Sequence, residues 1–164
     1  MKAASEGKVK EAKMSGDLQL VRFKLAGQDY GVGIMQVQSI DRIVPVTKVP
    51  RTPTFVEGVI NIRDEVIPVV DLRKRFELEI RPADNDTRIM IVEVEGKKVG
   101  IIVDAVSDVT TISERIVEPA PAMVIGIDSE YIKGVAKLEN ALLILLDLDK
   151  ILNPEEMKQL KQIK

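Results

Sequence analysis

The hydrophobic positions of this chain fall into short runs that are rich in valine and isoleucine and are bounded by Gly, Asp or Asn. Such runs are typical of β-strands rather than helices. Eight runs fit this description: Leu18–Leu25, Tyr30–Gly33, Val56–Ile62, Glu65–Val70, Arg88–Val94, Lys98–Val103, Tyr131–Leu138 and Ala141–Asp147. Many short strands predict a mainly β protein with a barrel architecture.

Short polar segments join several expected strands into hairpins. Gly27 and Gly96 each lie between two strands where the turn needs positive φ. Arg63-Asp64 and Glu139-Asn140 each leave two residues between strands, the length that favours primed turns. The proline-bearing segments between these hairpins are expected to be surface arches, because proline donates no backbone hydrogen bond.

Helix is scarce in the predicted structure. Apolar residues recur every third position at Ile34, Val37, Ile40 and Ile43, and again at Val103, Val106 and Val109. This spacing predicts a helical turn or two that packs by one apolar face. The clearest helix is the last one, with Asn153 as N-cap, Pro154 in the first position and lysines toward its end.

The two halves of the chain resemble each other. Phe23–Ile43 aligns with Val92–Ile112 at one constant offset, and Gly58–Phe76 aligns with Gly134–Leu152 at a slightly larger offset. Each copy has fewer than about 80 residues, which is small for an independent hydrophobic core. The repeat therefore predicts two similar sub-barrels that share one interior.

These patterns divide the chain into five parts. Residues 1–17 are small and charged without an apolar period, and are expected to be a flexible N-terminal arm. Residues 18–80 are expected to form the first β-barrel subdomain and residues 88–152 the second. The polar residues 81–87 are expected to connect them, and residues 153–164 to form the C-terminal helix.

The two copies differ most clearly at one hairpin tip. Copy one has Arg63-Asp64 where copy two has Glu139-Asn140, so the first residue of the tip reverses its charge. A difference between two copies indicates that one has been freed for a special task. An arginine at a tip is also often merely solvated, so this pattern alone leaves both interpretations open.

Composition narrows the possible chemistry. The chain has no Cys and no His, which excludes disulfides, thiolate zinc sites and catalytic systems built on either residue. No basic segment followed by an apolar one opens the chain, and the longest apolar run, Ala141–Leu146, has six residues. A membrane span needs about 20. A cytoplasmic protein without direct membrane insertion, and without a metal or cofactor, is therefore expected.

Other chemistries find little support in the sequence. The net charge is −2 with few aromatic residues, so nucleic-acid binding is disfavoured. The glycines around Gly31 match neither a dinucleotide fingerprint nor a phosphate loop. Asp147 repeats Asp71 at a strand end, where helix capping explains it better than metal binding. An acid-dependent hydrolase would need two converging carboxylates, and no pair is marked out.

Longer segments resemble a known family. The chain carries GVGIMQVQSI at Gly31–Ile40, VPRTPTFVEGVINIRDEVIPVVDLRKRF at Val49–Phe76, VGIIVDAVSDV at Val99–Val109, EPAP at Glu118–Pro121 and YIKGVAKLENALLILLDLDKIL at Tyr131–Leu152. Together they closely resemble the CheW family of bacterial chemotaxis coupling proteins, over about residues 17 to 157. The resemblance implies two five-stranded SH3-like barrels and a non-enzymatic adaptor. It implies two partners, the cytoplasmic hairpin tip of chemoreceptors and the regulatory domain of the histidine kinase CheA, in receptor arrays.

The resemblance also implies a receptor-facing groove between the barrels. By position, this groove would draw on Val37, Gly58, Asn61, Arg63, Val103 and Val109. Gly58 would let a receptor helix approach closely. Kinase contacts are expected on the outer ends of the barrels without assigned residues. Asp64 stands where the family usually has Gly, and Ser39 where Glu is common. The alternative is a β-barrel interaction module of another two-component signalling pathway.

Overall fold

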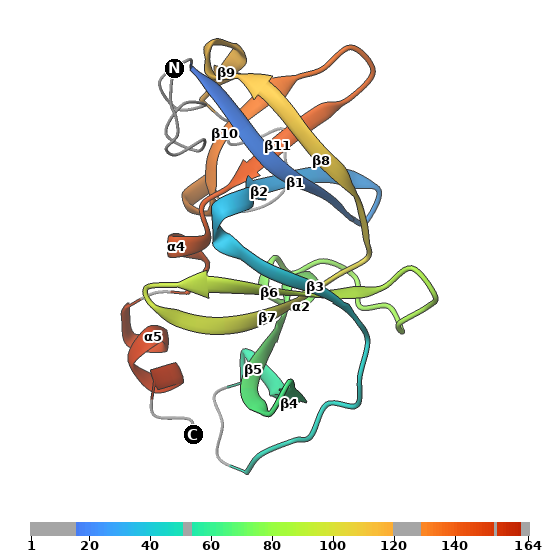
Figure 1. Ribbon diagram of the computed structural model, residues 1–164, viewed down its shortest axis with the longest axis vertical. Helices are drawn as coiled ribbons and strands as arrows, with labels where there is room; N and C mark the ends of the chain where they lie inside the picture. The colour runs from blue at the N-terminus through green and yellow to red at the C-terminus, as the bar shows by residue number, and fades with distance from the viewer. Residues whose placement is uncertain (1–15, 51–53, 120–128, 153, 162–164) are drawn as a thin grey trace.

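The computed structural model describes residues 16–50, 54–119, 129–152 and 154–161, and it is mainly β. Its strands form two sheets, which lie one above the other in Figure 1 and are called the upper and lower barrel below. The expected arm, residues 1–17, lies outside the described residues except for Gly16 and Asp17, where the first strand begins.

The upper barrel contains six strands in the order β8-β1-β2-β11-β10-β9. They are β1 (Asp17–Leu25), β2 (Gln28–Gly33), β8 (Ala105–Ser113), β9 (Val117–Glu118), β10 (Ile132–Lys137) and β11 (Leu142–Leu146). The 3₁₀ turns η2 (Glu114–Ile116) and η3 (Ser129–Tyr131) and the short helix α4 (Leu148–Ile151) accompany them. Because η2 joins β8 directly to β9, both edges of this sheet belong to one continuous segment.

The lower barrel contains five strands in the order β3-β6-β7-β5-β4. They are β3 (Val37–Arg42), β4 (Val56–Ile62), β5 (Glu65–Asp71), β6 (Arg88–Val94) and β7 (Lys97–Val103), with η1 (Ile34–Gln36) before β3 and α2 (Leu72–Arg75) after β5. Beyond β3, Thr47 pairs with Val59 of β4, with N···O distances of 2.9 and 2.8 Å. The segment after β3 therefore reaches the opposite edge of its own sheet, and the segment after β8 does the same in the upper barrel.

The two sheets confirm the predicted repeat but not the predicted subdomain boundaries. Matching strands of the two copies occupy matching places, but each copy gives its first hairpin to the other copy's sheet. The lower barrel is one continuous stretch, residues 37–103, and it is inserted between β2 and β8 of the upper barrel. The assignment of residues 18–80 and 88–152 to separate barrels is therefore wrong, because β1 and β2 pair with β8 and β11.

The apolar spacing read as helical turns forms strands instead. Only Ile34–Gln36 is helical, as a 3₁₀ turn, and the residues that follow are β3. Along β3, Val37, Ser39 and Asp41 are half-buried, while Ile40 and its neighbours on the other face are exposed. Alternation of this kind has the strand period of two, and β-branched residues favour it.

The largest core cluster lies between the barrels and draws on both. It combines residues of the upper barrel, such as Phe23 and Ile144, with residues of the lower barrel, such as Met90 and Val103. Each barrel also has a smaller core of its own, around Leu143 above and Ile89 below. The predicted shared interior is thus present, and neither barrel buries its apolar surface alone.

A buried ion pair fastens the junction of the barrels. Asp104 lies between β7 and β8, where the chain crosses from the lower to the upper barrel. Arg73 of α2 donates two hydrogen bonds to the Asp104 carboxylate, at 2.9 and 2.6 Å, and a third to the backbone carbonyl of Glu79. The backbone N–H of Ala26 donates to the same carboxylate at 2.8 Å. One carboxylate therefore holds α2 and the β1–β2 turn together.

The carboxylates at the ends of β5 and β11 are helix caps. Asp71 accepts a hydrogen bond from the backbone N–H of Arg73, and Asp147 accepts one from Asp149, at the starts of α2 and α4. The final helix, α5 (Pro154–Lys161), begins at the predicted proline. Its predicted cap Asn153, and residues 162–164, lie outside the described residues.

Candidate functional site

The hairpin β4–β5 ends in the charge-reversed tip. Ile62 pairs with Glu65, so Arg63 and Asp64 alone form the turn. Both have positive φ, 48° for Arg63 and 67° for Asp64. Positive φ at both central residues is the type I′ arrangement, which matches the twist of the two strands. The primed turn predicted at Arg63-Asp64 is confirmed, and Asp64 adopts the required conformation without a glycine. The primed turn predicted at Glu139-Asn140 is wrong, because neither residue has positive φ.

The Arg63 guanidinium is held against β3. One terminal nitrogen donates to Ser39 Oγ at 2.8 Å, and both reach the Asp41 carboxylate at 3.3 Å. Ser39 Oγ in turn donates to Asp41 Oδ2 at 2.8 Å. Arg63 follows β4, and β3 and β4 are opposite edges of the lower sheet, so these contacts also link the two edges.

Electrostatics favour the ionised form of Asp41. Burial alone would raise the pKa of Asp41, but hydrogen bonds from Arg63 and Ser39 outweigh it and hold the pKa below its usual value. The Arg63 side chain keeps 62% of its surface exposed. A guanidinium has five N–H donors, and those of Arg63 not used by Ser39 and Asp41 can bind another group.

Gly58 has a different role from the one predicted. Its φ is 152°, and a Cβ added to it would lie 2.4 Å from the backbone oxygen of Thr47. The space is thus filled by the chain's own crossing segment rather than by a partner helix. Gly134, the matching residue of copy two, is equally crowded by Val117 and Glu118. Glycine is needed at both places for close approach of two backbones.

The structure does not bring all the predicted site residues to one surface. Asn61 is exposed on β4 close to Arg63, opposite the exposed Val66 of β5. Val37 is half-buried and packs against the shared core. Val103 is 0% exposed, so it supports the fold and cannot touch a partner. Val109 is 53% exposed, but it lies on β8 of the upper barrel.

Large apolar side chains are exposed on this hairpin and on other elements of both barrels. They include Val66 of β5 on the hairpin, and Met35 of η1, Ile40 of β3 and Val109 of β8 elsewhere. Exposed apolar side chains beside a partly free arginine are typical of a protein-binding surface. Sequence reasoning missed Asp41 as part of it and named Ser39 only as a departure from the family. The two-residue spacing of Ser39 and Asp41 was a usable signal once β3 is taken as a strand.

Two further kinds of site are at issue in the described part of the chain, a cluster of metal ligands and a membrane-spanning helix. Within residues 16–50, 54–119, 129–152 and 154–161, no group of three or more acidic side chains is placed to hold a metal ion. No helix among the same residues is long and apolar enough to cross a bilayer. The paired barrels and their charged hairpin tip thus define a β-barrel module with a candidate surface for another protein.

Comparison with known proteins identifies the family. The family model described as CheW-like domain matches residues 19–156. The chain is 34% identical to the chemotaxis protein CheW of Klebsiella aerogenes, over 89% of this chain and 90% of that protein. It is 36% identical to the chemotaxis protein CheW of Treponema pallidum, over 88% of each chain. The chain belongs to the CheW-like family of chemotaxis scaffold proteins.

A solved structure supports the same assignment. The crystal structure of the scaffolding protein TtCheW from Thermoanaerobacter tengcongensis superposes with a TM-score of 0.77 at 41% sequence identity. The match covers 85% of this chain and 90% of that one. The predicted fold, two small β-barrel subdomains related by duplication, is confirmed together with the family.

Proposed function

We propose that this protein is a non-enzymatic adaptor that couples the cytoplasmic hairpin of chemoreceptors to the histidine kinase CheA. Membership of the CheW-like family supports this function. The observation that carries it to a surface of this chain is the exposed guanidinium of Arg63, held in place by Ser39 and Asp41. In this proposal the protein works in the cytoplasm and joins receptor arrays through its partners.

The hairpin tip suits a helical partner. A helix pair offers an apolar stripe flanked by charged side chains, and the hairpin that carries Arg63 offers the exposed side chain of Val66. Arg63 would bind a receptor carboxylate through its unused donors. Asn61, exposed on the same hairpin, adds a polar contact. Val37 and Val109 contribute where the barrels meet, and Val103 and Gly58 act only by shaping the fold.

The kinase is proposed to bind elsewhere on the barrels, at residues that we do not assign. An adaptor raises the effective concentration of two partners and fixes their geometry, so it needs no reactive group. This is consistent with a chain that has no Cys and no His.

Reconstitution tests the proposal. Kinase and receptor fragments are combined on a template with and without this protein, and kinase autophosphorylation is measured. Phosphorylation and its response to attractant should require all three components. Equal phosphorylation without the protein would contradict the adaptor function. Failure to bind either component would favour a module of another two-component pathway.

A further inference from the structure

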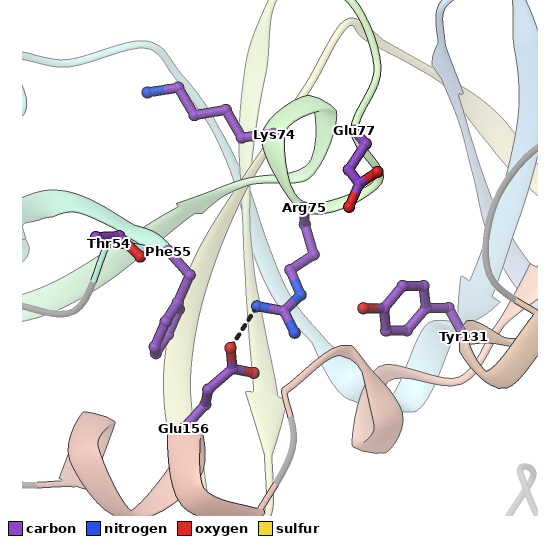
Figure 2. Close-up of a pocket in the computed structure, with 7 residues that line it drawn as sticks. All are labelled: Thr54, Phe55, Lys74, Arg75, Glu77, Tyr131 and Glu156. Atoms are coloured by element: carbon purple, nitrogen blue, oxygen red, sulfur yellow. Dashed lines mark hydrogen bonds and ion pairs between the residues drawn. The ribbon is translucent and has the colours of Figure 1, made fainter.

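A second polar site lies on the α2 side of the barrel junction, and it shares no residue with the Arg63 contacts. Figure 2 shows its lining: Thr54, Phe55, Lys74, Arg75, Glu77, Tyr131 and Glu156. These residues surround a cavity of about 340 Å³. They come from the segment before β4, from α2 and the residues just after it, from η3 of the upper barrel and from α5.

Arg75 is the centre of this site. Its guanidinium carbon lies 5.8 Å from the ring centroids of both Phe55 and Tyr131, so an aromatic face flanks the cation on each of two sides. Only 14% of its side chain is exposed. A cation buried to this extent needs a carboxylate. Glu156 of α5 supplies one, at 2.7 Å from one terminal nitrogen.

The guanidinium is not fully used by this contact. Its Nε is buried and has no hydrogen-bond partner. An arginine can bind a carboxylate through two parallel N–H groups, whereas Arg75 donates to Glu156 from a terminal nitrogen and leaves Nε unused. The Arg75 guanidinium therefore binds Glu156 without using its Nε–H donor.

The helix that supplies Glu156 is short. α5 has eight residues, below the length at which a helix is stable by itself. Its described side chains apart from Glu156, those of Pro154, Glu155, Lys158 and Gln159, are exposed. A competing segment therefore has to replace the Glu156–Arg75 ion pair and release a short helix.

We propose that the Arg75 pocket is a second protein-binding site, which takes a glutamate from the first turn of a partner's helix, and that Glu156 occupies it in the free protein. The occupant is argued from what the pocket already holds. Glu156 lies in the first turn of α5, and it is bound by a guanidinium that is flanked by two aromatic rings. Lys74 is already paired with Glu57 at 2.7 Å, so once Glu156 leaves, the Arg75 guanidinium is the cation of the lining that favours an acidic group.

A peptide with the sequence of residues 154–164 serves as the probe, because the first turn of α5 already places Glu156 against Arg75 in the folded chain. Three full-length proteins are titrated with it by calorimetry: the unaltered chain, Glu156→Gln and Glu155→Gln. Glu155→Gln is the matched control, since it removes the same charge from an exposed neighbour. Because Glu156→Gln removes the competing carboxylate, this variant should bind the peptide about tenfold or more tightly than the other two proteins.

Two further titrations locate the binding. A peptide carrying Glu156→Gln should bind at least about tenfold more weakly to the Glu156→Gln protein, while a peptide carrying Glu155→Gln should bind as before. Adding Arg75→Gln to the Glu156→Gln protein should abolish binding, with melting temperature as the check on folding. Equal binding by Glu156→Gln and Glu155→Gln proteins, or no saturable binding in the millimolar range, would overturn the proposal.

The outcome is separable from the adaptor function. Receptor-fragment affinity of Glu156→Gln should stay within about twofold of the unaltered chain, because distant sites contribute independently. A failed peptide titration would therefore leave the role of Arg63 intact, and a failed receptor titration would leave the Arg75 site intact.

Discussion

Two arginines of this protein pair with aspartates in very different surroundings. Arg73 binds Asp104 at the barrel junction, where the two side chains are 9% and 14% exposed. Arg63 binds Asp41 at the hairpin tip, where the values are 62% and 20%. Distances differ in the same direction: 2.6 Å for the closest contact at the junction, 3.3 Å at the tip.

The difference assigns the two pairs to different tasks. At the junction the Asp104 carboxylate joins α2 to the β1–β2 turn, and both side chains of its pair with Arg73 are largely buried. At the tip, the ion pair costs little to break because water already competes with it. The same pair of residue types therefore stabilises the fold in one place and presents a guanidinium to a partner in the other.

Cutting the chain within residues 81–87 should have the largest effect. The cut separates Arg73 from Asp104, and in each barrel it separates strands that pair with one another. A fragment of residues 16–80 has β1–β2 without β8 and β11, and β3 and β5 without β6 and β7. We expect it to be unfolded by circular dichroism and NMR, while the whole chain unfolds in one calorimetric transition. A cooperatively folded 16–80 fragment would show that the contiguous halves are domains after all.

Breaking the junction by one substitution comes next. Arg73→Met takes the closest cation from the largely buried Asp104 carboxylate and leaves it with the more exposed Arg81 at 3.6 Å, which should lower the free energy of unfolding by about 3 to 5 kcal/mol. Arg63→Met is the matched control at the exposed pair and should lower it by about 0 to 1 kcal/mol. Urea denaturation measures both. Equal losses would mean that burial does not distinguish the pairs.

The two pairs also show which parts of the structure could be predicted from the sequence alone. Strand existence, the repeat, the turn at Arg63 and the caps at Asp71 and Asp147 depend on neighbours in the chain, and the patterns predicted them. The exchange of hairpins depends on contacts between residues far apart, such as Arg22 of β1 with Asp108 of β8, and it was not predictable from periodicity.

The candidate site divides in the same way. The charge reversal pointed to Arg63, but its partners lie on a strand that was taken for a helical turn. Val103 and Gly58 were assigned to a partner surface. Val103 is instead buried, and the space beside Gly58 is occupied by the backbone of Thr47. Their exposure depends on which segment crosses over them, and one aligned sequence position does not contain that information.

Acid should weaken both ion pairs, and it should weaken the buried pair by the larger amount. Burial alone would raise the pKa of Asp104, but the Arg73 hydrogen bonds and the Ala26 N–H lower it below its usual value of 3.8. A carboxyl with a lowered folded-state pKa stabilises the protein above the unfolded-state pKa, and this stabilisation is lost as pH falls through the folded-state pKa.

Asp104→Asn should therefore destabilise the protein at pH 6, and the difference from the unaltered chain should shrink below about pH 4. Asp41→Asn should show the same trend with a smaller amplitude, because its pair is more exposed. Urea denaturation at several pH values gives the measurement. A difference for Asp104→Asn that stays constant down to pH 2 would contradict the ionic role of this residue.

At the tip, charge reversal should act on binding rather than on stability. Arg63→Glu should weaken binding of a receptor hairpin fragment by about 1 to 3 kcal/mol, because a charge-assisted contact becomes a repulsive one. Glu139→Arg reverses the charge of the matching tip in copy two and should leave the affinity unchanged. Receptor titrations that do not separate these two variants would remove Arg63 from the site, whereas kinase binding should be unaffected by either.

The smallest expected effect comes from releasing Arg63 within its own site. Asp41→Asn removes the competing charge but keeps the side-chain volume, and Ser39 can still accept the guanidinium hydrogen bond. Because an exposed ion pair contributes about 0 to 1 kcal/mol, receptor affinity should rise by a factor of about two to five. High salt should reduce this gain, since it screens the Arg63–Asp41 attraction in the unaltered chain. Weaker binding by Asp41→Asn would instead mean that Asp41 orients Arg63 for the receptor, and Ser39→Ala would then weaken binding as well.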